Sequence, residues 1–212
     1  MMTTHLTTGE LTLPEALMAF LHNDEGQVYQ SARPKQLTAA AELGEMLLQG
    51  QVGAAGDTIT VAPEPDAPTR PWMTDAVADL GDTPVKIDTW IRRRRDSLTI
   101  QQEAAQEQGV LHHDRAKLAG LVGYERHMVD DALRQSILAE LDGPAAQQAP
   151  RVAALAKLLT TPALARVQRF DKNRQERLTT LASAGHTPVP GPLFTALDYG
   201  VATAIGIGIL GS

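Results

Sequence analysis

Four consecutive arginines, Arg92, Arg93, Arg94 and Arg95, are the most conspicuous chemistry-bearing residues of this 212-residue sequence. Guanidinium groups stay charged and present several donors in a plane, so such a run can contact the phosphates of lipids or nucleic acids. On a helix, however, consecutive residues fan around the axis at 3.6 per turn and cannot form one flat stripe. The run is therefore either a basic patch at a membrane surface or a solvated helix end, where cations offset the helix dipole.

Other basic residues stand beside expected helix starts. Helix N-termini with nearby guanidinium groups can hold a phosphate, because backbone amides and side-chain donors converge there. The nearby acids Asp130 and Asp131 oppose an anion at one of these starts. On charge and expected position, the residues nominated for lipid or phosphate binding are Arg33, Lys35, Arg126 and Arg134.

Catalytic and metal-binding motifs are missing or misplaced. The sequence has no cysteine, no phosphate-binding Gly-Lys-Ser/Thr loop, no Gly-x-Ser-x-Gly elbow and no His-Glu-x-x-His. A Gly-x-Gly-x-x-Gly at 206–211 ends one residue before the C-terminus, so no helix follows to hold a pyrophosphate. His112 and His113 point to opposite faces of an expected strand and do not readily share an ion. We expect no enzyme, no cofactor and no metal.

Composition predicts a mainly α fold. Hydrophobic residues make up 43%, carried by Ala and Leu, and aromatic residues only 4%, which favours helix over sheet. The length suits one domain, expected over residues 10–212 after a disordered tail at 1–9. Apolar stripes and caps predict a bundle of amphipathic helices at 13–21, 34–49, 72–80, 84–95, 98–108, 130–141, 144–160 and, as one long helix, 162–184.

One or two short β-hairpins interrupt these helices. Residues 51–53 and 58–61 predict the first, and residues 110–112 with 118–122, joined through 113–117, predict the second. A final apolar segment closes the chain at 193–210. Its longest apolar stretch, at 199–210, is interrupted by glycines and is too short to span a membrane. Whether it packs in the core or lies exposed stays open.

Charge is unevenly distributed. The net charge is −6, with −9 over residues 1–85 and +3 over residues 86–212. An acidic chain is a poor generic binder of nucleic acid, because phosphate contacts need a basic face. We therefore expect no nucleic-acid partner, although the helix, arginine run and hairpin at 90–123 leave a winged-helix-like binder as a third interpretation.

The order of short motifs resembles the Golgi phosphoprotein 3 family over about residues 10–212. Each motif alone is weak, but their order is fairly specific. The matching segments are Leu11-Thr12-Leu13-Pro14-Glu15-Ala16-Leu17, Asp24-Glu25-Gly26, the helix-to-strand passage from Ala41 to Val52, Gln108-Gly109-Val110-Leu111 before a hairpin, and the helix from Ala132 to Leu141.

The resemblance implies a helical domain with a projecting β-hairpin. It further implies a cytoplasmic, peripheral membrane protein that binds phosphatidylinositol 4-phosphate, grips cytosolic tails of partner proteins and catalyses nothing. The Ala-rich, Cys-free composition resembles the bacterial, actinobacterial branch. A second copy of the chain is a further partner that this interpretation allows.

The expected lipid site is where the sequence departs from the family. Aligned on Glu45 and Gly50, the family's tryptophan falls near Gln30 and its first arginine near Ala39, and two later basic positions fall around 129–132. None is matched, so no family site residue is carried over.

This mismatch supports a second interpretation, a protein–protein adaptor of the same fold that has lost the lipid pocket. Its acidic N-terminal part would dock a basic peptide tail through Glu15, Glu42 or Glu45. The identity of the lipid, the identity of the protein partner and the oligomeric state stay open at this point.

Overall fold

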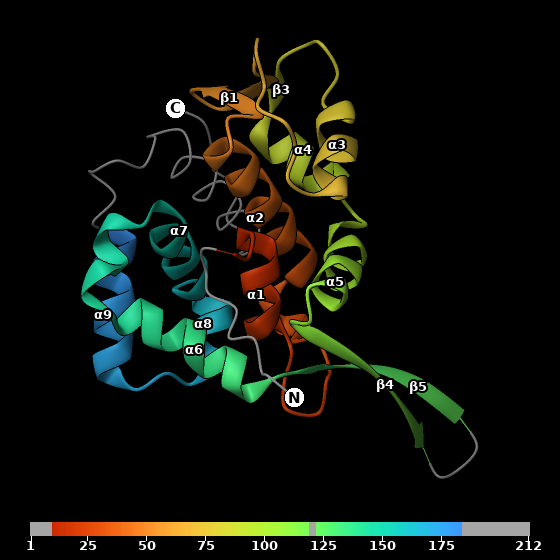
Figure 1. The fold of residues 1–212 in the computed structure, drawn as a ribbon, viewed down its shortest axis with the longest axis vertical. Helices are drawn as coiled ribbons and strands as arrows, with labels where there is room; N and C mark the ends of the chain where they lie inside the picture. Colours follow the sequence, from red (N-terminus) through yellow and green to blue (C-terminus); the bar gives the residue numbers. More distant parts are fainter. Residues whose placement is uncertain (1–9, 119–121, 184–212) are drawn as a thin grey trace.

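A computed structural model describes residues 10–118 and 122–183, and the expected tail at 1–9 and final segment at 193–210 lie outside these ranges. The described part is mainly helical with two small antiparallel sheets, as predicted (Figure 1). Its helices are α1 (Leu13–Leu21), η1 (Gln30–Ala32), α2 (Pro34–Leu48), α3 (Pro71–Ala78), α4 (Ile87–Arg93), α5 (Ser97–Glu107), α6 (Asp131–Asp142), η2 (Pro144–Gln148), α7 (Pro150–Leu159), α8 (Pro162–Gln168) and α9 (Lys172–Ser183). Its strands are β1 (Val52–Ala55), β2 (Thr58–Val61), β3 (Val85–Lys86), β4 (Leu111–Leu118) and β5 (Val122–Val129).

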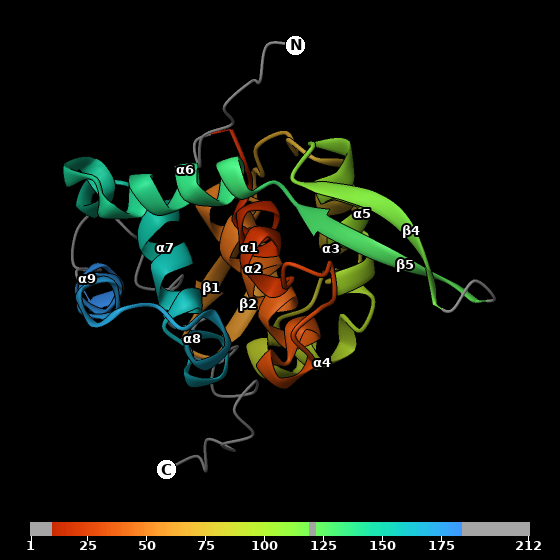
Figure 2. The same ribbon diagram turned by 90° about the horizontal axis from the view of Figure 1, so that it is seen from below.

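Helices α1 and α2 form the centre of the bundle. Every residue of α1 is buried, as is nearly the whole length of α2 from Leu37 to Leu47. Both helices pack against α5 and α7, and α6 packs on α1 (Figures 1 and 2). A helix buried on all sides is apolar all round, which explains why Ala and Leu dominate these segments.

The ends of the two central helices follow from local chemistry. The Thr12 backbone amide donates to Glu15 Oε2 at 2.8 Å, which is one half of the predicted capping box, and Pro14 lies in the first turn. Helix α2 ends at Leu48, and Gly50, just past its C-cap residue Gln49, has a φ of +64° that glycine adopts without strain. These boundaries are confirmed as predicted.

The first predicted hairpin is confirmed and gains a strand. Strands β1 and β2 pair from Val52 with Val61 to Ala55 with Thr58, and the two-residue β3 adds to β2. The predicted helix at 84–95 is therefore wrong at Val85 and Lys86, which form β3. Two residues are too few to show the alternating pattern of a strand.

The second hairpin is much longer than predicted. Strands β4 and β5 pair over eight residues each, from Leu111 with Val129 to Leu118 with Val122, so residues 113–117 are strand and not the expected loop. The hairpin projects from the bundle (Figure 1). Alternation of apolar and polar residues is the main sequence signal for a strand, and the polar run from His112 to Arg115 does not show it.

The base of this hairpin is fixed to the loop that follows α1. The His127 amide donates to the Gly26 carbonyl at 3.0 Å. Gly26 has φ +76°, and a Cβ there would lie 2.8 Å from Met128 Sδ and 3.0 Å from Arg126 Cβ. Only glycine fits at this contact without moving the strand.

The predicted long helix at 162–184 is wrong in one respect: it is two helices. Arg169 ends α8 with φ +49°, and the Asp171 carboxylate then accepts the Arg174 amide at 2.8 Å as α9 begins. Phe170, between them, packs edge-on against Phe20 with ring centroids 6.4 Å apart. Tertiary packing of this ring accounts for a break that helical periodicity alone does not show.

Three glutamates are completely buried in the bundle, and each is held by an arginine from a distant segment. Arg70 pairs with Glu15 at 2.7 Å, Arg94 with Glu42 at 3.0 Å, and Arg151 with Glu45 at 2.6 Å. Burial of a carboxylate is tolerated only with such charged and hydrogen-bonded partners.

Further donors complete two of these sites. The Leu13 amide donates to Glu45 at 2.7 Å, and Gln101 Nε2 donates to Glu42 at 2.8 Å. Burial still raises the pKa of Glu42, against the opposing effect of Arg94. The hydrogen bonds to Glu45 raise the pKa of Arg151. Helices α1 and α2 are thus joined by charge as well as by apolar contact.

Replacing Arg151 with methionine should lower the free energy of unfolding by about 3–5 kcal/mol, because Glu45 then stays buried without its main partner. Urea denaturation measures this change. The matched control is Glu176→Ala, which removes an exposed pair with Lys172 and should change stability by less than about 1 kcal/mol. Equal, small effects of the two substitutions would show that the buried pair does not stabilise the fold.

A buried histidine lies where the hairpin base meets the bundle. His22 Nδ1 lies 3.0 Å from the Met18 carbonyl, which can only accept, and Nε2 lies 3.0 Å from Gln102 Nε2. The neutral ring therefore satisfies both contacts, with the proton on Nδ1. Burial lowers the pKa of His22 from 6.5 to about 4, and His127 and Arg134 add to this effect.

Stability should therefore fall as the pH falls from about 6.5 to 4, because the unfolded chain takes up a proton at His22 that the folded protein refuses. The loss from this group approaches about 3 kcal/mol at the lower end. Urea titrations of His22→Gln across this pH range should show a flatter slope. The exposed His112→Gln serves as control and should keep the original slope; a His22→Gln slope equal to it would contradict the assignment.

Candidate functional site

An open cavity of about 830 Å³ is lined by residues of α6, α8, the start of α9 and the loop after α1. We call it the arginine pocket, because four arginines line it. Its charged and polar lining residues are Asn23, Asp24, Tyr29, Arg134, Gln135, Arg166, Gln168, Arg169, Asp171 and Arg174.

Arg134 forms a fixed wall of the pocket. It extends from α6, and its guanidinium donates to the carbonyls of Ala19 (2.9 Å) and His22 (3.1 Å) and to Asp24 (2.9 Å). Its side chain is 15% exposed. Of the four nominated phosphate-binding residues, this is the one found in the pocket, and most of its donors already hold the end of α1.

Two arginines of α8 supply the unused charge. Arg166 and Arg169 are exposed, and within the described part of the chain neither side chain has a hydrogen bond or an ion pair. Arg174, on α9, pairs with Asp142 at 2.7 Å, while its Nε is buried without a partner among the described residues. Guanidinium donors are thus available from both sides of the α8–α9 turn.

Arg169 has an unfavourable backbone conformation at that turn. Arg169 and Arg33 are the two non-glycine residues with positive φ in the described ranges, and left-handed backbone costs about 1–2 kcal/mol for such residues. Strain of this kind persists where the surrounding structure determines it and concentrates at functional sites. The pocket therefore contains an unpaired arginine held in an unfavourable backbone conformation.

The structure disperses the other nominated residues. Arg33 is exposed before α2, Lys35 lines a different cavity, and Arg126 lies on β5 opposite Asp114. Arg166, Arg169 and Arg174 were not predicted as site residues. On the single continuous helix predicted at 162–184, a basic side is expected to be a solvated face. The available signal was Phe170-Asp171, a large apolar residue followed by a residue that favours helix starts.

The arginine run is not a uniform patch of four. Arg94 is buried, pairs with Glu42 and with Asp79 (2.7 Å), and its guanidinium lies 5.8 Å from the Trp90 ring centre. Arg92, Arg93 and Arg95 are exposed, and Arg92 pairs with Asp88 one turn earlier. Arg94 is therefore not part of the surface patch that the sequence predicts.

The glutamates expected to dock a basic tail are also misplaced for that role. Glu15, Glu42 and Glu45 are all completely buried and paired, so no partner reaches them in the folded protein. The prediction that these glutamates are accessible is wrong, because α1 and α2 are buried on nearly every side.

Within the described ranges, no cluster of three or more potential ligands could hold a metal ion. No helix of that part is long and apolar enough to cross a membrane. His113 and His127 stack at 6.0 Å across the hairpin, and the His22 ring lies 5.7 Å from that of His127, but the described residues there form no group of three that could hold a metal ion.

The fold and the pocket together define a mainly helical domain with a projecting hairpin and an arginine-lined cavity between its helices. The sequence model of the Golgi phosphoprotein 3 (GPP34) family matches residues 13–198. The chain therefore belongs to this family, whose members are generally non-catalytic lipid-binding proteins. No curated protein matches the chain.

Replacing Arg169 with glycine should not destabilise the protein and should raise the free energy of unfolding by up to about 1 kcal/mol, because glycine adopts φ +49° freely. Arg169→Ala keeps the strain and is the matched comparison for loss of the side chain. Urea denaturation of both variants measures the difference. A glycine variant less stable than the alanine variant would show that the left-handed conformation is absent in solution.

Proposed function

We propose that this protein is a peripheral membrane protein that binds the phosphorylated headgroup of an anionic lipid in the arginine pocket. A phosphoinositide such as phosphatidylinositol 4-phosphate, for which the family is known, is the ligand class we favour. The proposal rests on two exposed guanidinium groups, those of Arg166 and Arg169, which line one cavity and have no partner among the described residues.

The cavity suits a phosphomonoester on a ring. Its volume lies within the range of about 300–1,000 Å³ usual for small-ligand sites. Arg166 and Arg169 would neutralise the doubly charged phosphate, because charge-assisted hydrogen bonds from arginine to phosphate are among the strongest in proteins. Tyr29 and Gln135 supply neutral donors and acceptors for ring hydroxyls.

Asp24 and Asp171 also line the pocket and shape its selectivity. Asp24 is occupied by Arg134, and Asp171 by the Arg174 amide, so both carboxylates are turned to structural contacts. They still make a phosphate bearing few further charges a better ligand than a highly phosphorylated one. This supports a monophosphorylated headgroup over a polyphosphorylated one.

The proposal assigns no bond-making step to any residue. Binding orients the protein at the cytoplasmic face of a membrane, and release is governed by the salt-sensitive contacts of the two arginines. We infer from the Ala-rich, Cys-free composition that the chain belongs to the bacterial branch of the family.

The double variant Arg166→Ala/Arg169→Ala should lose the preference for phosphatidylinositol 4-phosphate vesicles over phosphatidylserine vesicles of equal surface charge. Flotation through a density gradient measures the bound fraction. Losing two charged hydrogen bonds to phosphate, at about 1.5–3 kcal/mol each, should weaken binding to the phosphoinositide vesicles by at least roughly 150-fold.

Lys172→Ala is the control, because Lys172 lies beside the pocket on α9 and pairs with Glu176 on the surface. It should leave the preference intact. An unchanged preference in the double variant would contradict the proposal, as would wild-type protein that floats equally with both anionic vesicles.

A further inference from the structure

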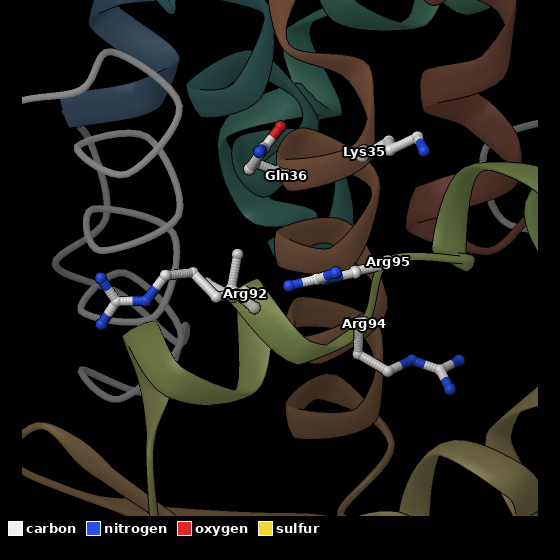
Figure 3. A pocket seen from close by; sticks show the side chains of 6 residues that line it. Lys35, Gln36, Arg92, Arg94 and Arg95 are labelled. Carbon is white, nitrogen blue, oxygen red and sulfur yellow. The ribbon is translucent and has the colours of Figure 1, made fainter.

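A second basic cavity lies where the start of α2 meets the turn between α4 and α5. It has a volume of about 360 Å³ and is lined by Lys35 and Gln36 from α2 and by Ile91, Arg92, Arg94 and Arg95 from the end of α4 and the turn after it (Figure 3). We call it the basic seat. It joins one residue nominated for phosphate binding, Lys35, to the arginine run.

Positive charge at the basic seat exceeds what its neighbours neutralise. Lys35 and Arg95 are exposed, and neither side chain has a partner within the described part of the chain. Arg92 shares its charge with Asp88. Arg94 lies below them, where its Nη2 is buried without a hydrogen-bond partner among the described residues. Two cations that have no partner among the described residues, Lys35 and Arg95, therefore line a single cavity.

The walls of the basic seat are held at a fixed separation. Ser97 Oγ donates to the Lys35 carbonyl at 2.9 Å, which ties the start of α5 to the start of α2. Arg94, turned away from Arg92 in Figure 3, binds Glu42 at 3.0 Å and so anchors the turn that carries Arg95. The segments that carry Lys35 and Arg95 are therefore held at a fixed separation by these contacts.

The basic seat continues the charged surface of the arginine pocket. Helix η1 packs against α8, which carries Arg166 and Arg169, and Arg33 follows η1 directly. Lys35 comes two residues later and opens the basic seat. Exposed cations thus extend from α8 through the η1–α2 junction to the α4–α5 turn.

We infer that the basic seat is a second lipid contact, which takes the headgroup phosphate of an anionic phospholipid such as phosphatidylserine while a phosphoinositide occupies the arginine pocket. Continuity with the arginine pocket and the two unpaired cations carry this inference. It rests on the proposed function for the orientation of the protein at the membrane. The volume of about 360 Å³ accommodates a headgroup phosphate.

The experiment uses the full chain and vesicles that contain phosphatidylserine but no phosphoinositide, so that the arginine pocket does not decide the result. Lys35→Ala/Arg95→Ala should weaken flotation by about 25-fold, near five-fold for each cation removed from an anionic surface. The same variant should still prefer phosphatidylinositol 4-phosphate vesicles over phosphatidylserine vesicles.

The matched control is Lys86→Ala, which removes one nearby charge that is 67% exposed and paired with Asp57. It should weaken binding less than two-fold, whereas Arg95→Ala alone should weaken it about five-fold. Equal effects of Lys86→Ala and Arg95→Ala would overturn the inference, because they would reduce the basic seat to net charge alone. Urea denaturation confirms that each variant is folded.

Millimolar inorganic phosphate added to the phosphatidylserine vesicles tests whether the basic seat holds a phosphate group. It should weaken flotation of the wild-type protein more than a chloride salt of equal ionic strength, and should have no such extra effect on Lys35→Ala/Arg95→Ala. Equal effects of the two salts on the wild-type protein would overturn the assignment of a headgroup phosphate to this cavity. Loss of phosphoinositide preference in Arg166→Ala/Arg169→Ala, with retained sensitivity to Lys35→Ala/Arg95→Ala, separates failure of one site from failure of the other.

Discussion

Neutralisation of three buried carboxylates is the constraint on which the rest of this structure depends. A carboxylate removed from water is tolerated only if cations and hydrogen-bond donors surround it, and each central glutamate here receives an arginine from a segment far along the chain. The start of α3, the turn after α4 and the start of α7 must therefore lie where Arg70, Arg94 and Arg151 can reach α1 and α2. Apolar packing fills the space between these fixed points.

The same constraint divides the arginines into two populations. The arginines of one population form ion pairs with the buried glutamates. Those of the other lie exposed at the α8–α9 turn and the α4–α5 turn, where they remain available to anions. Arg94 and Arg95 are neighbours in sequence, yet one is buried and the other exposed. The acidic character of residues 1–85 is likewise partly internal, so net charge along the chain misrepresents the charge that a partner meets.

Local chemistry made part of this fold predictable, and long-range packing made the rest unpredictable. The Thr12–Glu15 spacing and Gly50 define helix ends by contacts within a few residues, so the sequence suffices for them. The α8–α9 break depends on Phe170 meeting Phe20, and the burial of Glu45 depends on Arg151. Arg134 could be nominated from the sequence because it flanks a helix start. Arg166 and Arg169 could not, because one continuous helix was expected at 162–184.

The distance along the chain between Glu45 and its partner has a consequence for synthesis. Arg151 is 106 residues further on, and ribosomes add roughly 5–20 residues per second, so α2 waits on the order of 5–20 s for its counter-ion. During that interval a growing chain carries two apolar helices with an uncompensated charge between them. Such a chain is a natural client for holding chaperones, and the domain completes its centre only after most of it has left the ribosome.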